Sequence, residues 1–238
     1  MPADVLAAML RSDATAPRIT QYDDTDSPTK GERLEFSAKV LANWVSKAAN
    51  LLQDEFDVSV GTSVRLALPA HWRTAYWALA AWSVGATVVL GPPGSGPGPV
   101  PDPDDLTLTV TDDPDLAGAA DPAVLVTLAG LARRATVEVP EGVVDEAKEL
   151  ATFADAFTAW DEADPSDTAL VSATGSTGYA DLVGHHAEGR FHLLDPDVES
   201  FLRTCLAVWA AGGSIVLTRG RPSAATLAQR LASEHCMP

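Results

Sequence analysis

Apolar residues recur at helical spacing along much of the chain. The longest such pattern follows Ser37, a typical helix N-cap residue, and places apolar side chains from Val40 to Leu52 on one side of a helix that ends near Phe56. Further helices are predicted where the same spacing returns, at 3–11, 71–86, 145–160, 197–213 and 221–235.

Short apolar runs alternate with these helices. The segments 18–22 and 33–37 alternate apolar and polar residues around a polar loop, which predicts a β-hairpin. Other strands are predicted at 63–69, 87–91, 106–110, 123–128, within 164–172 and at 214–218. Because continuous β-branched runs fit strands buried on both faces, we expect an α/β fold with a largely parallel sheet flanked by helices. The order of strands does not follow from the pattern.

The region 91–105 interrupts this alternation with a sequence dominated by Gly and Pro. Such a composition is incompatible with regular helix or strand and predicts a flexible or polyproline-like loop. We interpret residues 1–238 as a single α/β domain that carries this loop.

Composition limits the partners of the protein. The formal net charge is -17, from 33 acidic and 16 basic residues. This balance argues against nucleic acids and anionic membranes, which bind basic surfaces. Cys205 and Cys236 are too few for a disulfide framework, and no segment reads as a signal peptide or as the ~18 apolar residues of a spanning helix. We therefore expect a cytoplasmic protein with reduced cysteines.

The candidate chemistry lies at Thr174, Gly175, Ser176, Thr177 and Gly178, a compact turn of glycines and hydroxyl residues. The two glycines can adopt positive φ and let backbone amides converge, and the hydroxyl groups add donors, which suits a phosphate. The turn matches neither the Walker motif nor the dinucleotide fingerprint, and clusters of this kind are most often plain loops.

Two other groups of residues invite a functional interpretation. His185, His186 and His192 form a His-His-x5-His cluster, but no cysteine or carboxylate completes a familiar zinc spacing, so ordinary surface histidines are favoured and no metal site is assigned. The tryptophans sit at core spacing, which favours packing, although Trp72 at a helix start could flank a ligand or a partner.

Several stretches, in the same order, resemble the amino-terminal part of the acyl-activating, adenylate-forming enzymes such as acyl-CoA synthetases. The segment 33–69 is similar to the family's opening block, 72–91 to its Gly-Ala core motif, 167–183 to its phosphate loop and 201–218 to the helix and strand that follow. The resemblance covers roughly residues 18–235. It implies the amino-terminal subdomain of that fold and ATP or AMP as cofactor. More narrowly, the chain resembles a short actinobacterial family of unknown function that is remotely similar to these enzymes.

The sequence departs from the family pattern at positions that the family uses for ATP binding. The family's loop reads Thr-Ser-Gly-Ser-Thr-Gly-x-Pro-Lys-Gly, so Ala173 stands for the first Thr, Ala180 for Pro and Asp181 for Lys. Exchanging a cation for an anion beside a phosphate matters, because two unit charges about 4 Å apart interact by ~4 kcal/mol at an effective dielectric of 20. The resemblance also implies that the second subdomain, which carries the adenine and ribose contacts, would begin only after Pro238.

These observations lead to three hypotheses. The first is a non-catalytic relative of the adenylate-forming enzymes that acts as a binding or regulatory module, with no catalytic residue assigned. The second is an acyl-activating enzyme, of the acid-thiol ligase type, whose nucleotide or phosphate site is completed by a partner chain. The third is an interaction protein that forms a homodimer or binds a protein partner, because a domain cut from a larger fold leaves an apolar face to be covered.

Overall fold

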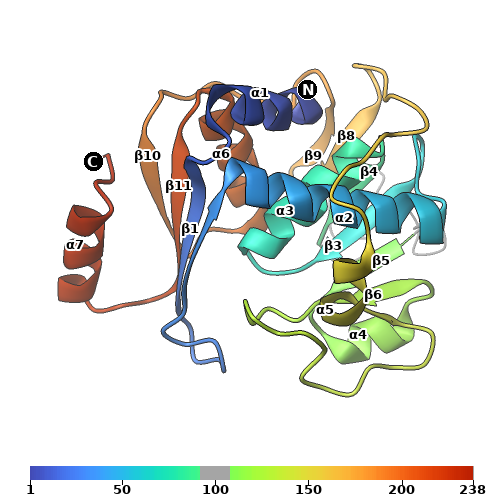
Figure 1. The fold of residues 1–238 in the computed structure, drawn as a ribbon, viewed down its shortest axis with the longest axis horizontal. Coiled ribbons are helices and arrows are strands. Elements are labelled where there is room, and N and C mark those ends of the chain that lie inside the picture. Colours follow the sequence, from blue (N-terminus) through green and yellow to red (C-terminus); the bar gives the residue numbers. More distant parts are fainter. Residues whose placement is uncertain (92–107, 238) are drawn as a thin grey trace.

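The computed structural model describes residues 1–91 and 108–237, whose arrangement is shown in Figure 1. The helices are α1 (Pro2–Asp13), α2 (Ala38–Phe56), α3 (Trp72–Ser83), α4 (Pro114–Ala119), α5 (Glu146–Glu149), α6 (Val198–Ala210) and α7 (Ala224–Ser233), with a 3-10 helix at Leu150–Thr152. The strands are β1 (Pro17–Asp24), β2 (Arg33–Ser37), β3 (Ser63–Ala67), β4 (Thr87–Leu90), β5 (Leu108–Thr111), β6 (Ala123–Leu125), β7 (Val144–Asp145), β8 (Thr168–Ser172), β9 (Gly175–Gly178), β10 (Arg190–Leu194) and β11 (Ser214–Gly220). Apart from Gly91, the Gly/Pro-rich loop predicted at 91–105 lies outside the described residues.

The larger of two sheets has seven strands in the order β7-β6-β5-β3-β4-β8-β9. All neighbouring strands from β7 to β8 run parallel, and β9 returns antiparallel to β8. The continuous apolar runs of the sequence lie in its interior; β5, for example, is buried along its whole length. The predicted α/β fold with a largely parallel, helix-flanked sheet is thus confirmed.

A second sheet, which the sequence pattern did not predict, has four strands in the order β10-β11-β1-β2. The hairpin predicted for 18–22 and 33–37 forms its edge as antiparallel β1 and β2. Strand β1 also pairs in parallel with β11, so that Ile19 lies opposite Ile215. This pairing joins the two ends of the chain, a long-range contact that local periodicity does not encode.

Helix α3 lies between the two sheets and connects them (Figure 1). Its side chains are buried from Trp72 through Trp82. The Trp82 indole donates a hydrogen bond to the Ala169 carbonyl of β8 (2.8 Å), and the Trp72 backbone amide donates to the Gln21 side chain of β1 (2.9 Å). The predicted packing role of the tryptophans is confirmed here, because a helix buried on all sides needs apolar residues around its whole circumference.

The predicted helix at 145–160 is wrong beyond residue 152. Residues 153–160, which we call the strap, run without regular structure across α2 (Figure 1). Asn50 of α2 donates to the carbonyls of Ala154 and Ala156, both at 3.0 Å, and Gln53 donates to the carbonyl of Thr158 and accepts from the Trp160 amide. Side chains of α2 therefore replace the bonds that a helix would make for itself.

The apolar residues that suggested this helix still pack inward. Phe153 and Phe157 contact the main core from the strap. Lys47 adds a hydrogen bond to the Phe153 carbonyl and an ion pair with Asp155 at 2.9 Å. The apolar spacing thus predicted correctly which side chains are buried, but the contacts with α2 determine the backbone conformation.

Smaller differences concern element boundaries. Strand β6 ends at Leu125 rather than 128, and α7 begins at Ala224 because Ser223 caps it, which leaves Pro222 just outside the helix. Cys205 and Cys236 are free thiols, as expected. Among residues 1–91 and 108–237, no helix combines the length and apolar character needed to cross a membrane.

Candidate functional site

The predicted phosphate turn is a tight hairpin rather than an open loop. Strand β8 ends at Ser172, two residues form the turn, and β9 begins at Gly175, which pairs with Ser172. We call residues 172–178 the hydroxyl hairpin. Gly175 has a φ of +127°, which favours glycine, whereas Gly178 does not adopt positive φ. The structure thus brings all five predicted residues together, with most of them in a strand.

The hydroxyl groups of this hairpin hold a carboxylate of the same chain. Thr174 donates to both carboxylate oxygens of Glu199 on α6, at 2.8 and 3.0 Å. The hydroxyl oxygens of Ser172 and Thr174 lie 3.0 Å apart, and Ser172 also bonds to Glu199. An anion of the chain therefore already occupies the hydroxyl of Thr174, one of the donors that the sequence assigned to a phosphate.

Arg203 completes this arrangement from the next turn of α6. Its Nε donates to Glu199 at 2.8 Å, and its Nη2 donates to the hydroxyl oxygen of Thr177 at 2.8 Å. The sequence reasoning missed this cation, although the i, i+4 spacing of Glu199 and Arg203 on a predicted helix was a usable signal. The guanidinium lies beside the hairpin, but its charge is matched by that of Glu199.

The environment of Glu199 favours its ionised form. Burial raises the pKa of this carboxyl, but hydrogen bonds from Ser172, Arg203 and Thr174 outweigh burial and hold the pKa below its ordinary value. Glu199 is therefore a carboxylate at neutral pH and repels a second anion placed at the same donors.

Of the five predicted residues, Thr174 and Ser176 are exposed, whereas the other three are half-buried. Asp181 is also exposed, and its backbone amide closes a turn on the Gly178 carbonyl at 3.2 Å. No side chain approaches within 4 Å of the position that a Cβ on Gly175 would take. Gly178 pairs with Thr168, so Asp181, the acidic residue that replaces the expected lysine, follows the end of the hairpin that lies opposite the Thr174 turn.

The three histidines do not converge on one point. His185 and His186 are exposed, whereas His192 lies in β10 with its Nε2 3.0 Å from the hydroxyl oxygen of Thr218. Within the described ranges, no group of three His, Cys, Asp or Glu side chains could hold a metal ion.

A second polar cluster, which the sequence analysis did not find, is buried under the start of α3. Arg73 and Glu146 form an ion pair at 2.6 Å, and their side chains are 2% and 0% exposed. The Tyr76 hydroxyl donates to the same carboxylate oxygen of Glu146, and Arg73 also donates to the Ala129 carbonyl at 3.0 Å. Burial raises the pKa of Glu146, although the Arg73 guanidinium opposes that rise.

This cluster answers the question raised about Trp72. The Trp72 side chain is 1% exposed, and the Arg73 guanidinium lies 4.6 Å from its ring centroid. His71 caps the helix by accepting from the Arg73 amide at 3.1 Å, and burial, with the charges of Arg219 and Arg73, lowers the pKa of His71 well below its ordinary value. These residues pack and cap α3 in the interior, away from any surface ligand.

The chain was compared with protein-family models, with curated proteins and with solved structures. No protein-family model matches the chain. A segment of 86 residues is 46% identical to a TIGR03089 family protein from Mycobacterium tuberculosis, and the match covers 36% of this chain and 34% of that protein. The chain thus matches about a third of this curated relative.

Solved structures cover nearly the whole chain at low sequence identity. VinN, solved with L-aspartate, is 17% identical with a TM-score of 0.65, over 100% of this chain and 65% of VinN. An acyl-CoA synthetase from Brucella canis is 16% identical with a TM-score of 0.69, over 98% of this chain and 46% of that enzyme. A fatty acyl CoA synthetase from Mycobacterium tuberculosis is 10% identical with a TM-score of 0.62, over 99% of this chain and 48% of that enzyme. The chain therefore has the fold found in acyl-CoA synthetases, and the resemblance expected from its motifs is confirmed at the level of the fold.

Proposed function

We propose that this chain is a non-catalytic relative of the adenylate-forming enzymes and acts as a binding or regulatory module. The observation that carries the proposal is the Glu199 carboxylate, which already accepts hydrogen bonds from the hydroxyl hairpin and from Arg203. A site of this kind offers an incoming triphosphate few free donors.

Electrostatics supports the same conclusion. A phosphate at the turn of the hairpin would meet Glu199 directly, and the charge of Arg203 is already matched by Glu199. Two like charges about 4 Å apart repel by ~4 kcal/mol at an effective dielectric of 20, which is roughly three powers of ten in affinity. ATP would have to displace an ionised side chain as well as overcome this repulsion.

The test is isothermal titration of the intact chain with MgATP, followed by an assay for pyrophosphate release in the presence of carboxylic acids. The proposal expects no pyrophosphate release and little or no ATP binding by the natural chain. Magnesium-dependent ATP binding followed by pyrophosphate release would overturn it and would favour the alternative of an acyl-activating enzyme.

A variant of Glu199 and a matched control test whether this carboxylate keeps phosphate away from the hairpin. Replacing Glu199 by Gln removes the internal anion and should raise the affinity of the hairpin for inorganic phosphate, whereas Glu188→Gln, at an exposed position before β10, should not. If neither variant changes phosphate binding, Glu199 does not control access to the hairpin, and the proposal loses its main support.

A further inference from the structure

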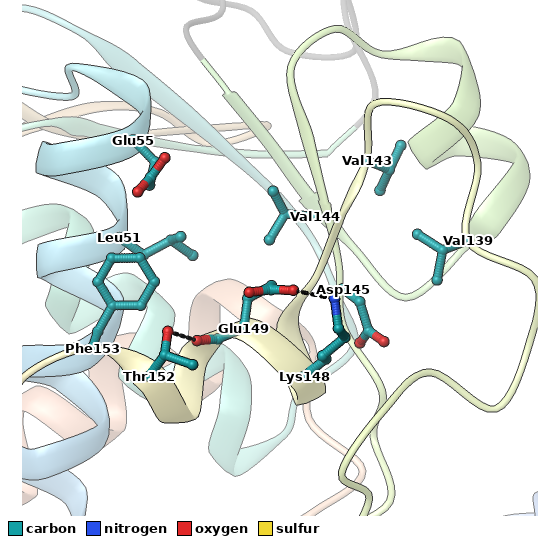
Figure 2. Close-up of a pocket in the computed structure, with 10 residues that line it drawn as sticks. All are labelled: Leu51, Glu55, Val139, Val143, Val144, Asp145, Lys148, Glu149, Thr152 and Phe153. Atoms are coloured by element: carbon teal, nitrogen blue, oxygen red, sulfur yellow. Dashed lines mark hydrogen bonds and ion pairs between the residues drawn. The ribbon is translucent and has the colours of Figure 1, made fainter.

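A cavity of about 490 Å³ lies between α2, the segment 139–145 and α5 (Figure 2). Its volume falls in the range of roughly 300–1,000 Å³ that small-molecule sites occupy. None of its lining residues belongs to the hydroxyl hairpin or to α6, so its occupancy does not depend on the proposed function.

The cavity has two apolar walls. Leu51 and Phe153 form one side, and Val139, Val143 and Val144 approach from the other (Figure 2). Leu51 belongs to the main core, whereas Val139 and Val143 pack against a separate small apolar cluster. The cavity therefore lies at the seam between two packed units, where an apolar ligand could remove surface from water without displacing core side chains.

The charges around these walls are mainly negative. Asp145 caps α5 by accepting from the Ala147 amide at 3.1 Å, and its other oxygen accepts from the Ala135 amide at 2.8 Å. Lys148 and Glu149 form an ion pair at 2.5 Å. Glu149 also raises the pKa of Lys148 and so keeps that ammonium charged.

Glu55 is the remaining carboxylate. It projects from α2 toward the cavity (Figure 2) and has neither a hydrogen bond nor an ion pair with the part of the chain that the structure describes. With Lys148 matched by Glu149, the carboxylates of Glu55 and Asp145 give the cavity an uncompensated negative charge. Two apolar walls beside an unpaired carboxylate are complementary to an apolar molecule that carries one positive charge.

We propose that this cavity binds an organic cation, a protonated amine on a short aliphatic or aromatic body. The ammonium group pairs with Glu55, and the apolar body lies between Leu51 and Phe153 on one side and the valines on the other. A carboxylate of the same shape is rejected, because it would face Glu55 and Asp145, and the one cation among the described lining residues, Lys148, is already paired with Glu149.

Three probes of nearly equal shape test this proposal by isothermal titration: 4-phenylbutylamine, 4-phenylbutanol and 4-phenylbutanoate. The amine should bind saturably, the alcohol more weakly and the carboxylate most weakly. Equal or tighter binding of the carboxylate overturns the proposal, and so does the absence of amine binding at concentrations up to about 10 mM, the weak end of specific recognition.

Variants locate the amine. Glu55→Gln should weaken the binding of 4-phenylbutylamine by about fivefold, because it removes one solvent-accessible charge contact. The affinity for 4-phenylbutanol should stay unchanged. Asp54→Asn, one residue earlier on the same exposed part of α2, should change neither affinity by more than about twofold. Val139→Phe should lower the affinity for both probes, because the larger side chain fills part of the cavity. Unchanged amine binding in both Glu55→Gln and Val139→Phe would show that the amine binds elsewhere.

Discussion

Two clusters in this molecule are built from the same parts, an arginine, a glutamate and a hydroxyl group, and they differ in their access to water. In the pair of Arg73 with Glu146 both side chains are almost fully buried, whereas those of Arg203 and Glu199 are 34% and 16% exposed. A buried pair cannot exchange its partners for water, and a partly exposed pair can. The first pair therefore tolerates poorly the loss of one member, and the second is suited to a change of partners.

The largest expected effect is at the buried cluster. Glu146→Ala leaves the Arg73 charge without a partner in the interior and should lower the free energy of unfolding by about 3–5 kcal/mol in urea denaturation. The double variant Arg73→Met with Glu146→Leu should recover most of this loss, because it removes both charges. A loss below about 1 kcal/mol for Glu146→Ala would mean that water reaches the cluster.

The equivalent change at the partly exposed cluster should cost less. Glu199→Ala removes an acceptor from Thr174 and Arg203, but water can replace it, so the free energy of unfolding should fall by only about 1–2 kcal/mol. Glu188→Ala is the matched control and should be close to neutral. The contrast between the clusters fails if Glu199→Ala is as damaging as Glu146→Ala.

A single hydroxyl tests the hairpin more finely. Thr177→Val keeps the shape of the side chain and removes the acceptor of Arg203, which should lower the free energy of unfolding by about 0.5–1 kcal/mol. Ser176→Ala, at the exposed neighbouring position, should stay within about 0.5 kcal/mol of the natural chain. Equal losses at the two positions would show that strand propensity, rather than the Arg203 contact, sets the cost.

The smallest effect is a difference in pH dependence. The folded-state pKa of Glu199 is lowered, so its contribution to stability is present above the unfolded value of about 4.3 and is lost as the pH falls through the folded value. The pKa of Glu146 is raised, so its contribution is present below about 4.3 and is lost as the pH rises through that value to the folded one. Urea denaturation of Glu199→Gln and Glu146→Gln between about pH 3 and 6 should therefore show opposite trends relative to the natural chain. Parallel trends would contradict the assigned environments.

The local spacing of apolar residues and capping residues predicted helices and strands well where the conformation depends on neighbours in the sequence. Ser37 caps α2 by accepting from the Val40 amide, and the helix ends at Phe56 as expected. The tryptophans of α3 are buried as their spacing suggested. The parallel pairing of β1 with β11 was not predictable in this way, because the two strands are far apart in the sequence and nothing local links them.

The candidate site likewise has a part that the sequence predicted and a part that depends on tertiary packing. The hydroxyl and glycine residues at 174–178 were recognisable from composition, and the structure does bring them together. Their partners Glu199 and Arg203 were not found, because the pairing of a hairpin with the first turns of a later helix depends on tertiary packing. The cluster of Arg73 with Glu146 was missed for the same reason, since its members come from distant segments.

The strap across α2 has a consequence for the sequences that this fold can accept. Asn50 and Gln53 bind strap carbonyls, which every amino acid possesses, so the exposed side chains of Ala154, Ala156 and Thr158 contribute little to this contact. The spacing of those carbonyls is set by the number of residues instead. These three residues should therefore tolerate substitution, whereas Phe153 and Phe157 are constrained by their contacts with the main core. The strap should not tolerate the insertion or deletion of a single residue. On α2 the identities of residues 50 and 53 are the constraint.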